Sequence, residues 1–276
     1  MKITFWGTRG SIAAPGPETL RYGGNTSCVE LRMSEKHVVI LDAGTGIRRL
    51  AEGLPDTIER VDLLLTHLHM DHIQGLGFFK HLRMPQVNLT LWGPASATMN
   101  LRDRLSRYLS PPLFPVRIRD LSLRILEVPG QEFDLPDVKV TADFVTHPGP
   151  TVGYRIEGPW GVVAYLPDHE PALGVPNFPR EPEWTSGHDL AQGADVLIHD
   201  SQYTHGEYPA RVGWGHSTMH DMVTFAMLAK VKRLVPFHYD PARTDDQLDA
   251  CIAEAVADRR PNFPVTPAAE GASIEL

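Results

Sequence analysis

Four side chains able to bind a metal ion fall within six residues, directly after the apolar run Leu63–Leu65: His67, His69, Asp71 and His72. His67 and His69 alternate as they would at the end of a strand, so both can point the same way. Neutral imidazole and carboxylate groups are ligands that suit zinc, manganese or iron. A polar loop with satisfied histidines is the alternative, but the whole string favours ligands for two adjacent metal ions.

This string resembles the signature of the metallo-β-lactamase-fold hydrolases. The other elements of that family follow in the expected order, each after an apolar run: His147, Asp168 and His238. The opening strand followed by Gly7-Thr8-Arg9-Gly10-Ser11 also looks like this family, so the resemblance covers nearly the whole chain. It implies an α/β fold, the αββα four-layer sandwich, with two mixed β-sheets face to face and helices outside. We expect one domain spanning residues 1–276.

The resemblance also implies a ligand set for two divalent metal ions. Carried over by position, the first ion takes His67, His69 and His147, the second takes Asp71, His72 and His238, and Asp168 bridges them. Two dications about 3.5–4 Å apart can hold a bridging water, lower its pKa and polarise the substrate oxygen. Zinc is the expected metal, with manganese or iron as alternatives. Asp168 taken alone would equally suit a turn or a helix N-cap.

Two later segments resemble paired elements of the ribonuclease Z and phosphodiesterase branch of the family. In that branch an acidic residue holds a histidine that protonates the leaving oxygen, and by position these are Asp200 and His216. A neighbouring carboxylate keeps an imidazole protonated and aimed, as an alkoxide leaving group requires. The alternative is that His216 and Ser217 only cap a following helix. Alternation points His199 away from Asp200, so we interpret His199 as structural.

The chain departs from ribonuclease Z in two respects. It lacks the long Gly- and Lys-rich arm that grips transfer RNA, and Asp200-Ser201 stands where that family has Glu in a His-Glu-Ala context. We therefore expect a phosphodiesterase for cyclic nucleotides or other small phosphodiesters. A metal-bridging hydroxide would be the nucleophile, His216 and Asp200 would supply the general acid, and Asp71 would join them as a catalytic residue.

Other functions stay open at this point. A lactone, ester or thioester hydrolase could use the same metal site, with less need for His216. A ribonuclease Z-like RNA nuclease is a second alternative, and a module that senses a ligand or oxygen is a third. Fold alone does not choose among them.

Composition narrows the partners. The 276 residues carry a formal net charge of −8, which counts against long nucleic acids, although a local basic patch can survive it. Six arginines fall within Leu101–Arg124 and could steer an anionic substrate, but a solvated helix face is the favoured interpretation. Arg9 and Arg21 are weaker candidates for that role. A small-molecule phosphodiester is the expected partner, and a homodimer is a candidate because dimers are common in the resembled family.

The two cysteines, Cys28 and Cys251, are far apart in sequence and read as reduced thiols. No apolar stretch of about 18 residues occurs, so we expect no membrane-spanning helix. The N-terminus lacks the pattern of a signal peptide. Together these features predict a cytoplasmic protein.

Alternation and apolar runs predict ten strands: Ile3–Trp6, Cys28–Met33, Val38–Leu41, Leu63–Leu65, Val87–Trp92, Val138–Val145, Gly153–Glu157, Val162–Tyr165, Val196–Ile198 and Arg233–Phe237. Helical periodicity predicts five helices: Gly46–Leu54, Ile73–Leu82, Ala95–Leu109, Ser217–Ala229 and Asp245–Ala257. The stretch Pro167–Trp184 reads as a long surface loop.

Overall fold

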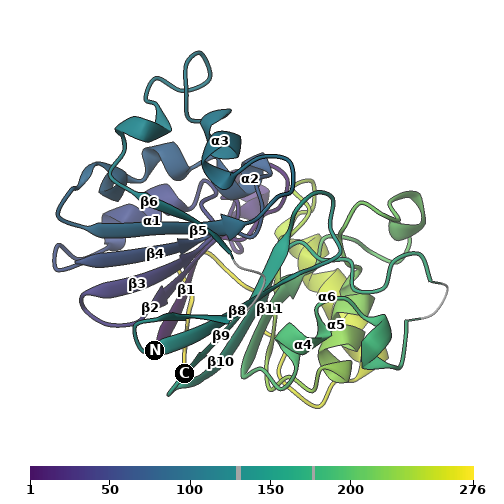
Figure 1. The fold of residues 1–276 in the computed structure, drawn as a ribbon. Helices are drawn as coiled ribbons and strands as arrows, with labels where there is room; N and C mark the ends of the chain where they lie inside the picture. The colour runs from purple at the N-terminus through teal and green to yellow at the C-terminus, as the bar shows by residue number, and fades with distance from the viewer. Residues whose placement is uncertain (129–131, 176–177) are drawn as a thin grey trace.

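The computed structural model describes residues 1–128, 132–175 and 178–276. Two mixed β-sheets lie face to face, and helices cover the outer side of each sheet (Figure 1). This is the predicted αββα sandwich. Among the described residues no helix is long and apolar enough to cross a membrane. That the chain forms a single domain stays a prediction.

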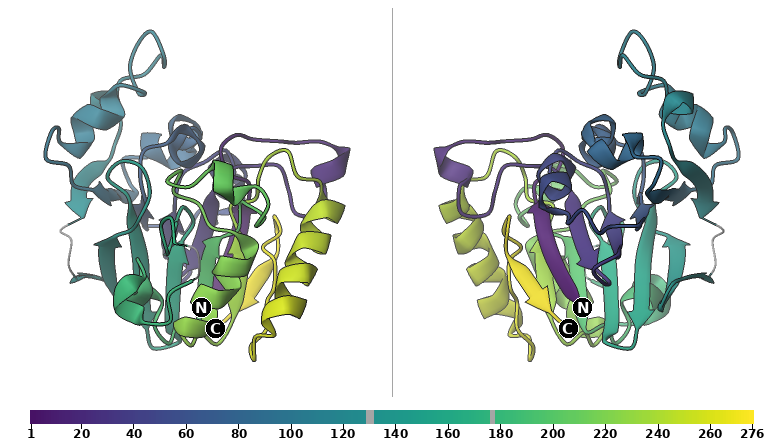
Figure 2. Two further views of the ribbon diagram at one scale, coloured as in Figure 1. Left: turned by 90° about the vertical axis from the view of Figure 1, so that its right-hand side faces the viewer. Right: turned by 90° about the vertical axis from the view of Figure 1, so that its left-hand side faces the viewer.

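The first sheet has seven strands in the order β13-β1-β2-β3-β4-β5-β6. Their bounds are β1 Lys2–Gly7, β2 Cys28–Arg32, β3 His37–Leu41, β4 Arg60–Leu64, β5 Asn88–Pro94, β6 Arg124–Val128 and β13 Ser273–Glu275. Strands β3 to β6 run parallel, whereas β13, β1, β2 and β3 pair antiparallel. Because β13 pairs with β1, the two ends of the chain lie side by side (Figure 2).

The second sheet has six strands in the order β12-β11-β10-β9-β8-β7. Their bounds are β7 Glu132–Leu135, β8 Val138–Phe144, β9 Val152–Gly158, β10 Gly161–Leu166, β11 Val196–Asp200 and β12 Leu234–Phe237. Strands β10, β11 and β12 are parallel, and the rest pair antiparallel. Three parallel strands therefore end at one edge of this sheet, as β3 to β6 do in the first.

Alternation along the strands sorts side chains between two apolar layers. In β3, Val39 and Leu41 face the core between the two sheets, while Val38 and Ile40 pack under the helices that cover the first sheet. All four are fully buried. A strand buried on both faces reads as a continuous apolar run, which is why β3 and β4 could be predicted from sequence.

The helices are α1 Ile47–Gly53, α2 Met70–Ile73, α3 Leu101–Ser106, α4 His188–Ala191, α5 Met219–Leu228 and α6 Asp245–Arg259. The predicted helix Ile73–Leu82 was wrong: α2 ends at Ile73, and two short 3-10 turns follow at Leu76–Phe78 and Lys80–Arg83. Gly75 lies at the break, where a Cβ would be 2.1 Å from the carbonyl oxygen of Gly44, so this close approach requires glycine.

Two other predicted helix starts shift for reasons of capping, whereas α6 begins at Asp245 as predicted. The helix predicted from Ala95 starts only at Leu101, where the side chain of Asn100 accepts a hydrogen bond from the backbone of Asp103. Thr218, not Ser217, caps α5. Thr244 caps α6 in a capping box with Gln247. Local hydrogen bonds at the first turn therefore decide where these helices begin.

The structure adds elements that periodicity did not reveal and changes one loop. Strands β6, β7 and β13 and helix α4 were not predicted. Of the loop predicted over Pro167–Trp184, the first residues, Pro167–Pro171, are buried, and exposed residues begin only at Leu173. Residues 176–177 of this predicted loop lie outside the described residues.

A buried ion pair ties the N-terminal loop to the last helix. The guanidinium of Arg9 is fully buried and donates to the carboxylate of Asp245 at 2.9 Å and to the backbone oxygens of Gly23 and Arg243. Arg9 is therefore unavailable for the anion-steering role considered above. Arg21 pairs with Asp246 at the surface.

We predict that Arg9→Met lowers the free energy of unfolding by about 3–5 kcal/mol, because it leaves the buried Asp245 carboxylate without its cationic partner. Arg21→Met is the matched control: its exposed pair should cost no more than about 1 kcal/mol. Urea denaturation of both variants at the same metal loading measures the difference. Equal losses would contradict the assignment of a structural role to Arg9.

Candidate metal centre and active site

The predicted ligands lie where strands of both sheets end. His67 and His69 follow β4, Asp168 follows β10, and His238 follows β12. His147 comes after β8, and α2 carries Asp71 and His72. Strand ends from two facing sheets thus bring all seven predicted ligands to one edge of the sandwich, in two groups that share Asp168.

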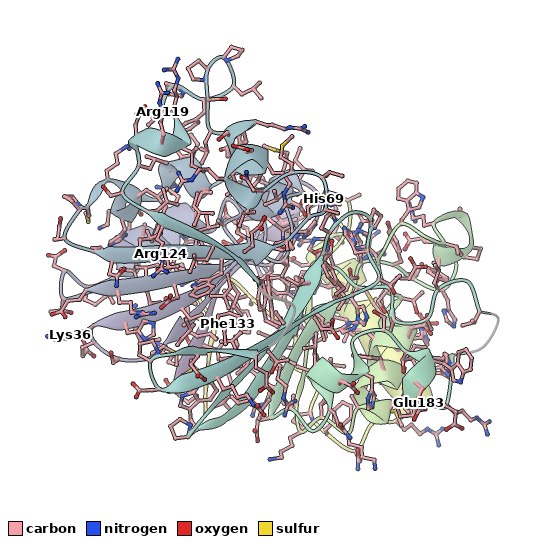
Figure 3. The ribbon with its side chains drawn as sticks, viewed as in Figure 1. Lys36, His69, Arg119, Arg124, Phe133 and Glu183 are labelled. Carbon is pink, nitrogen blue, oxygen red and sulfur yellow. The ribbon has the colours of Figure 1, made fainter. Side chains whose placement is uncertain are left out.

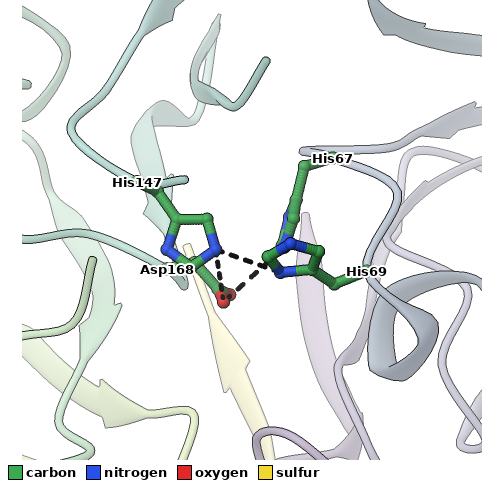
Figure 4. Close-up of side chains that lie close together, drawn as sticks. All are labelled: His67, His69, His147 and Asp168. Carbon is green, nitrogen blue, oxygen red and sulfur yellow. Dashed lines mark hydrogen bonds and ion pairs between the residues drawn. The ribbon is translucent and has the colours of Figure 1, made fainter. Parts of the chain in front are cut away.

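The first group consists of His67, His69, His147 and Asp168 (Figure 4). The Nδ1 of His69 lies 3.1 Å from the Nε2 of His147. The Oδ2 of Asp168 lies 3.7 Å from the Nε2 atoms of both His67 and His147. Three ring nitrogens and one carboxylate oxygen therefore converge on one point, as a tetrahedral metal site requires.

The second group consists of Asp71, His72, His238 and Asp168. The Nε2 atoms of His72 and His238 lie 3.3 Å apart, and the Oδ2 of Asp71 is 3.3 and 3.1 Å from them. The other carboxylate oxygen of Asp168, Oδ1, lies 2.9 and 3.2 Å from the same two nitrogens. Asp168 thus turns one oxygen to each group.

The donor atoms are suited to divalent cations. The Nε2 of His67 is buried without a hydrogen-bond partner among the described residues. Burial lowers the pKa of His67 well below its usual value and that of His147 to about 4, so both rings are neutral near pH 7. Neutral imidazoles that face one another beside a shared carboxylate fit metal ligation, which needs deprotonated ligands.

A buried carboxylate that the sequence did not single out orients the second group. Asp42 follows β3 and accepts hydrogen bonds from the backbone and hydroxyl of Thr66 and from the hydroxyl of Tyr165. Its Oδ2 lies 2.8 Å from the Nδ1 of His72. A carboxylate behind a ligand histidine fixes the ring and its tautomer. An acid directly after a buried strand was the available signal.

Backbone groups complete the support. The backbone N–H of Ser11 donates to the Oδ2 of Asp71 at 2.7 Å. The Nδ1 of His147 donates to the carbonyl oxygen of Gly215 at 2.8 Å. Glycine is needed at Gly10, because a Cβ there would lie 2.4 Å from the Nδ1 of His238.

Asp200 and His216 form a pair beside the two groups. The Nδ1 of His216 lies 2.6 Å from the Oδ2 of Asp200, which is fully buried at the end of β11. Burial of the imidazole opposes its protonation, but the Asp200 carboxylate outweighs this effect and raises the pKa of His216 to about 8. The ring of His216 stacks on His238 at a centroid distance of 5.1 Å and meets His147 edge-on at 5.1 Å.

Glu170 fixes the loop that carries His216. This buried carboxylate accepts hydrogen bonds from the hydroxyl of Tyr208 and from the backbone N–H groups of Gly213 and Gly215. The role of Glu170 could not be predicted, because nothing in the sequence places residues 208–215 against the segment that follows β10.

Two other groups of predicted residues lie outside the centre. His199 points into the layer under α5, with its Nε2 2.9 Å from the Nδ1 of His169, which agrees with a structural role. Most of the arginine-rich stretch forms a projection above the first sheet, and Figure 3 shows Arg119 on this projection, well apart from His69. Arg124 begins β6 and also lies apart from His69 in that view.

Comparison with known proteins bears on this geometry. Residues 37–239 match the family described as the beta-lactamase superfamily domain. The chain belongs to this superfamily. It is also similar to the ribonuclease Z of Brevibacillus brevis, at 25% identity over 98% of this chain and 95% of that protein. Together with the likeness to this relative, membership of the superfamily supports a metal-dependent hydrolase.

Solved structures agree on the fold of this superfamily member. The metallo-beta-lactamase fold protein YhfI from Bacillus subtilis superposes with a TM-score of 0.71 at 19% identity, over 100% of this chain and 98% of that one. A diphosphatase of the PhnP family superposes with a TM-score of 0.67 at 20% identity, over 100% and 97%. At such identities the likeness establishes the fold.

We predict that Asp42→Asn weakens zinc binding roughly 10–100-fold, the usual effect of removing a group that orients a ligand histidine. Competition with a coloured chelator measures the affinity. Asp62→Asn is the matched control, since Asp62 is equally buried but bonds to His37, Arg60 and Trp92. Weakening of the same size in both variants would show that the loss reflects general destabilisation.

Proposed function

We propose that the chain is a binuclear metal-dependent phosphodiesterase that acts on cyclic nucleotides or other small phosphodiesters. The observation that carries the proposal is the His216–Asp200 pair next to the two ligand groups. A metal centre alone would serve esters and lactones as well. The imidazole of His216 contacts the rings of His147 and His238 and is held by the Asp200 carboxylate. It can therefore donate the proton that a poor alkoxide leaving group needs.

The first ion would be held by His67, His69 and His147, the second by Asp71, His72 and His238, with Asp168 between them. When bound, such a pair of divalent ions supplies an activated water and polarises the phosphoryl oxygens. Groups of nitrogen and carboxylate donors suit zinc, although manganese and iron accept the same donors.

The residues of the chain take the remaining tasks. Asp200 accepts the hydrogen bond from Nδ1 of His216 and also the backbone N–H groups of Gln202 and Ser217, so its position is fixed. Nε2 of His216 is then free to hold a proton and deliver it to the leaving oxygen. Asp71, fixed by the backbone of Ser11, orients the second ligand group toward the same substrate.

A ribonuclease Z-like activity is the second candidate. The ribonuclease Z relative matches almost the whole chain, and the same centre and acid would cleave an RNA phosphodiester. The net charge of −8 favours a small substrate over a long nucleic acid. A cytoplasmic location, a small-molecule phosphodiester partner and a homodimer stay part of the proposal.

We predict that His216→Ala slows hydrolysis by roughly 10²–10⁴-fold, the typical contribution of one general acid. The loss should depend on the leaving group. p-Nitrophenolate leaves without a proton, so bis(p-nitrophenyl) phosphate should suffer least, whereas a cyclic nucleotide should suffer most. Steady-state kinetics with both substrates, together with lactones and thioesters, measure these effects, and elemental analysis checks that the metal content is unchanged.

His69→Ala is the control for a ligand: it should lose metal and impair every substrate alike. Metal loss in His216→Ala would make that residue a ligand. Equal damage to good and poor leaving groups would leave it with a packing role. If wild-type protein prefers lactones or thioesters by orders of magnitude, a carboxylic ester hydrolase replaces the proposal, and efficient cleavage of precursor transfer RNA favours the ribonuclease.

A further inference from the structure

An exposed indole, that of Trp214, belongs to the loop that carries the acid of the centre. Trp214 is 59% exposed, although aromatic side chains of this size are normally covered. The next two residues are Gly215, whose carbonyl oxygen accepts a hydrogen bond from the ring of His147, and His216 itself. The backbone of Trp214 is therefore fixed at the rim of the centre.

The loop presents this indole rigidly. Glu170 accepts hydrogen bonds from the backbone N–H groups on both sides of Trp214, at 3.0 Å from Gly213 and 2.9 Å from Gly215. The backbone N–H of Trp214 donates to the carbonyl oxygen of Arg211 at 3.0 Å. A side chain that is held in place and left uncovered can bind a flat ligand with little loss of conformational entropy.

Trp214 does not belong to the large groove nearby. That groove, of about 1320 Å³, runs along α5, and its described lining includes Tyr208 and Val212 but not Trp214.

Two other large apolar side chains, Ile12 and Met70, are 61% and 49% exposed, and each is next in sequence to a residue that forms or supports the centre. Ile12 follows Ser11, which donates to Asp71, and Met70 lies between His69 and Asp71. Three exposed apolar residues thus lie on the segments that form the centre.

One cation is linked to His216 through an aromatic ring. The guanidinium of Arg211 stacks over Tyr203 at 4.9 Å from the ring centroid, and the edge of that ring meets His216 at 5.6 Å between centroids. Arg211 forms no ion pair among the described residues, in contrast to Arg9 and Arg243, whose guanidinium groups bind Asp245 and Glu207. A guanidinium without a carboxylate partner is free to bind a phosphate.

We propose that Trp214 and Arg211 form a nucleotide-recognition subsite: the indole stacks on a base, and the guanidinium binds a phosphate other than the one that reacts. The inference rests on the proposed function and narrows its substrate class from phosphodiesters in general to nucleotides with a second phosphate. Stacking on the indole distinguishes such a ligand from a sugar phosphate that has no base.

Binding measurements test the subsite without relying on turnover. Isothermal titration of the zinc-loaded protein compares thymidine 3′,5′-bisphosphate, thymidine 5′-monophosphate and 2-deoxyribose 3,5-bisphosphate, which lacks the base. We expect Trp214→Ala to weaken binding of both thymidine ligands roughly 5–150-fold, the range that corresponds to one stacked base. Its affinity for the sugar bisphosphate should not change.

Arg211→Met should remove the advantage of the bisphosphate over the monophosphate, and Arg211→Lys should restore part of it. Trp184→Ala and Arg119→Met are matched controls, because both side chains are exposed but lie on other elements. These controls should bind as the wild type does.

Unchanged thymidine affinity in Trp214→Ala, or equal weakening for the sugar bisphosphate, would overturn the base contact. Failure of the wild type to bind any of the three ligands would overturn the whole subsite. Intact nucleotide binding without phosphodiester turnover would instead contradict the proposed function and leave the subsite standing, so the two failures can be told apart.

Discussion

The structure of the site depends on one carboxylate that serves two groups of imidazoles. Asp168 is 2% exposed and faces His67 and His147 with one oxygen and His72 and His238 with the other. Burial opposes its ionisation, but the surrounding histidines hold its pKa well below the usual range. An anion so placed would offset the repulsion between two cations held by the two ligand groups.

The sandwich makes that position possible. Asp168 follows β10 in the second sheet, as His147 and His238 follow β8 and β12, whereas His67 follows β4 in the first. The carboxylate therefore meets His67 only because the two sheets pack face to face. Asp42 at the end of β3 joins the same arrangement through Tyr165, a residue of β10. Packing in the core between the sheets therefore sets the geometry of the ligands.

Much of this could be predicted from sequence because the ligands follow apolar runs. A buried strand that ends in a polar side chain is visible as a pattern, and the string from His67 to His72 gives four such side chains together. Asp42 shows the same signal, but a single carboxylate after a strand does not differ from a turn residue. Glu170 and Arg211 carried no local signal, since their roles arise from contacts between segments distant in the chain.

The missed elements have equally physical causes. Strands β6 and β7 are half exposed and carry charged residues such as Arg124 and Glu132, so they lack an apolar run. The helix expected over Ile73–Leu82 does not form, and Gly75 lies where the backbone packs too closely for a Cβ. Helix propensity summed over this segment favours a helix, but the tertiary contacts of the segment override that propensity.

The measurement that tests the central claim most directly is anomalous diffraction from crystals grown with zinc, recorded on both sides of the zinc absorption edge. We expect two peaks about 3.5–4 Å apart, one on each side of the Asp168 carboxylate. One should lie among His67, His69 and His147, and the other among Asp71, His72 and His238. A single peak, or peaks bound to other residues, would contradict the account of a binuclear centre bridged by Asp168.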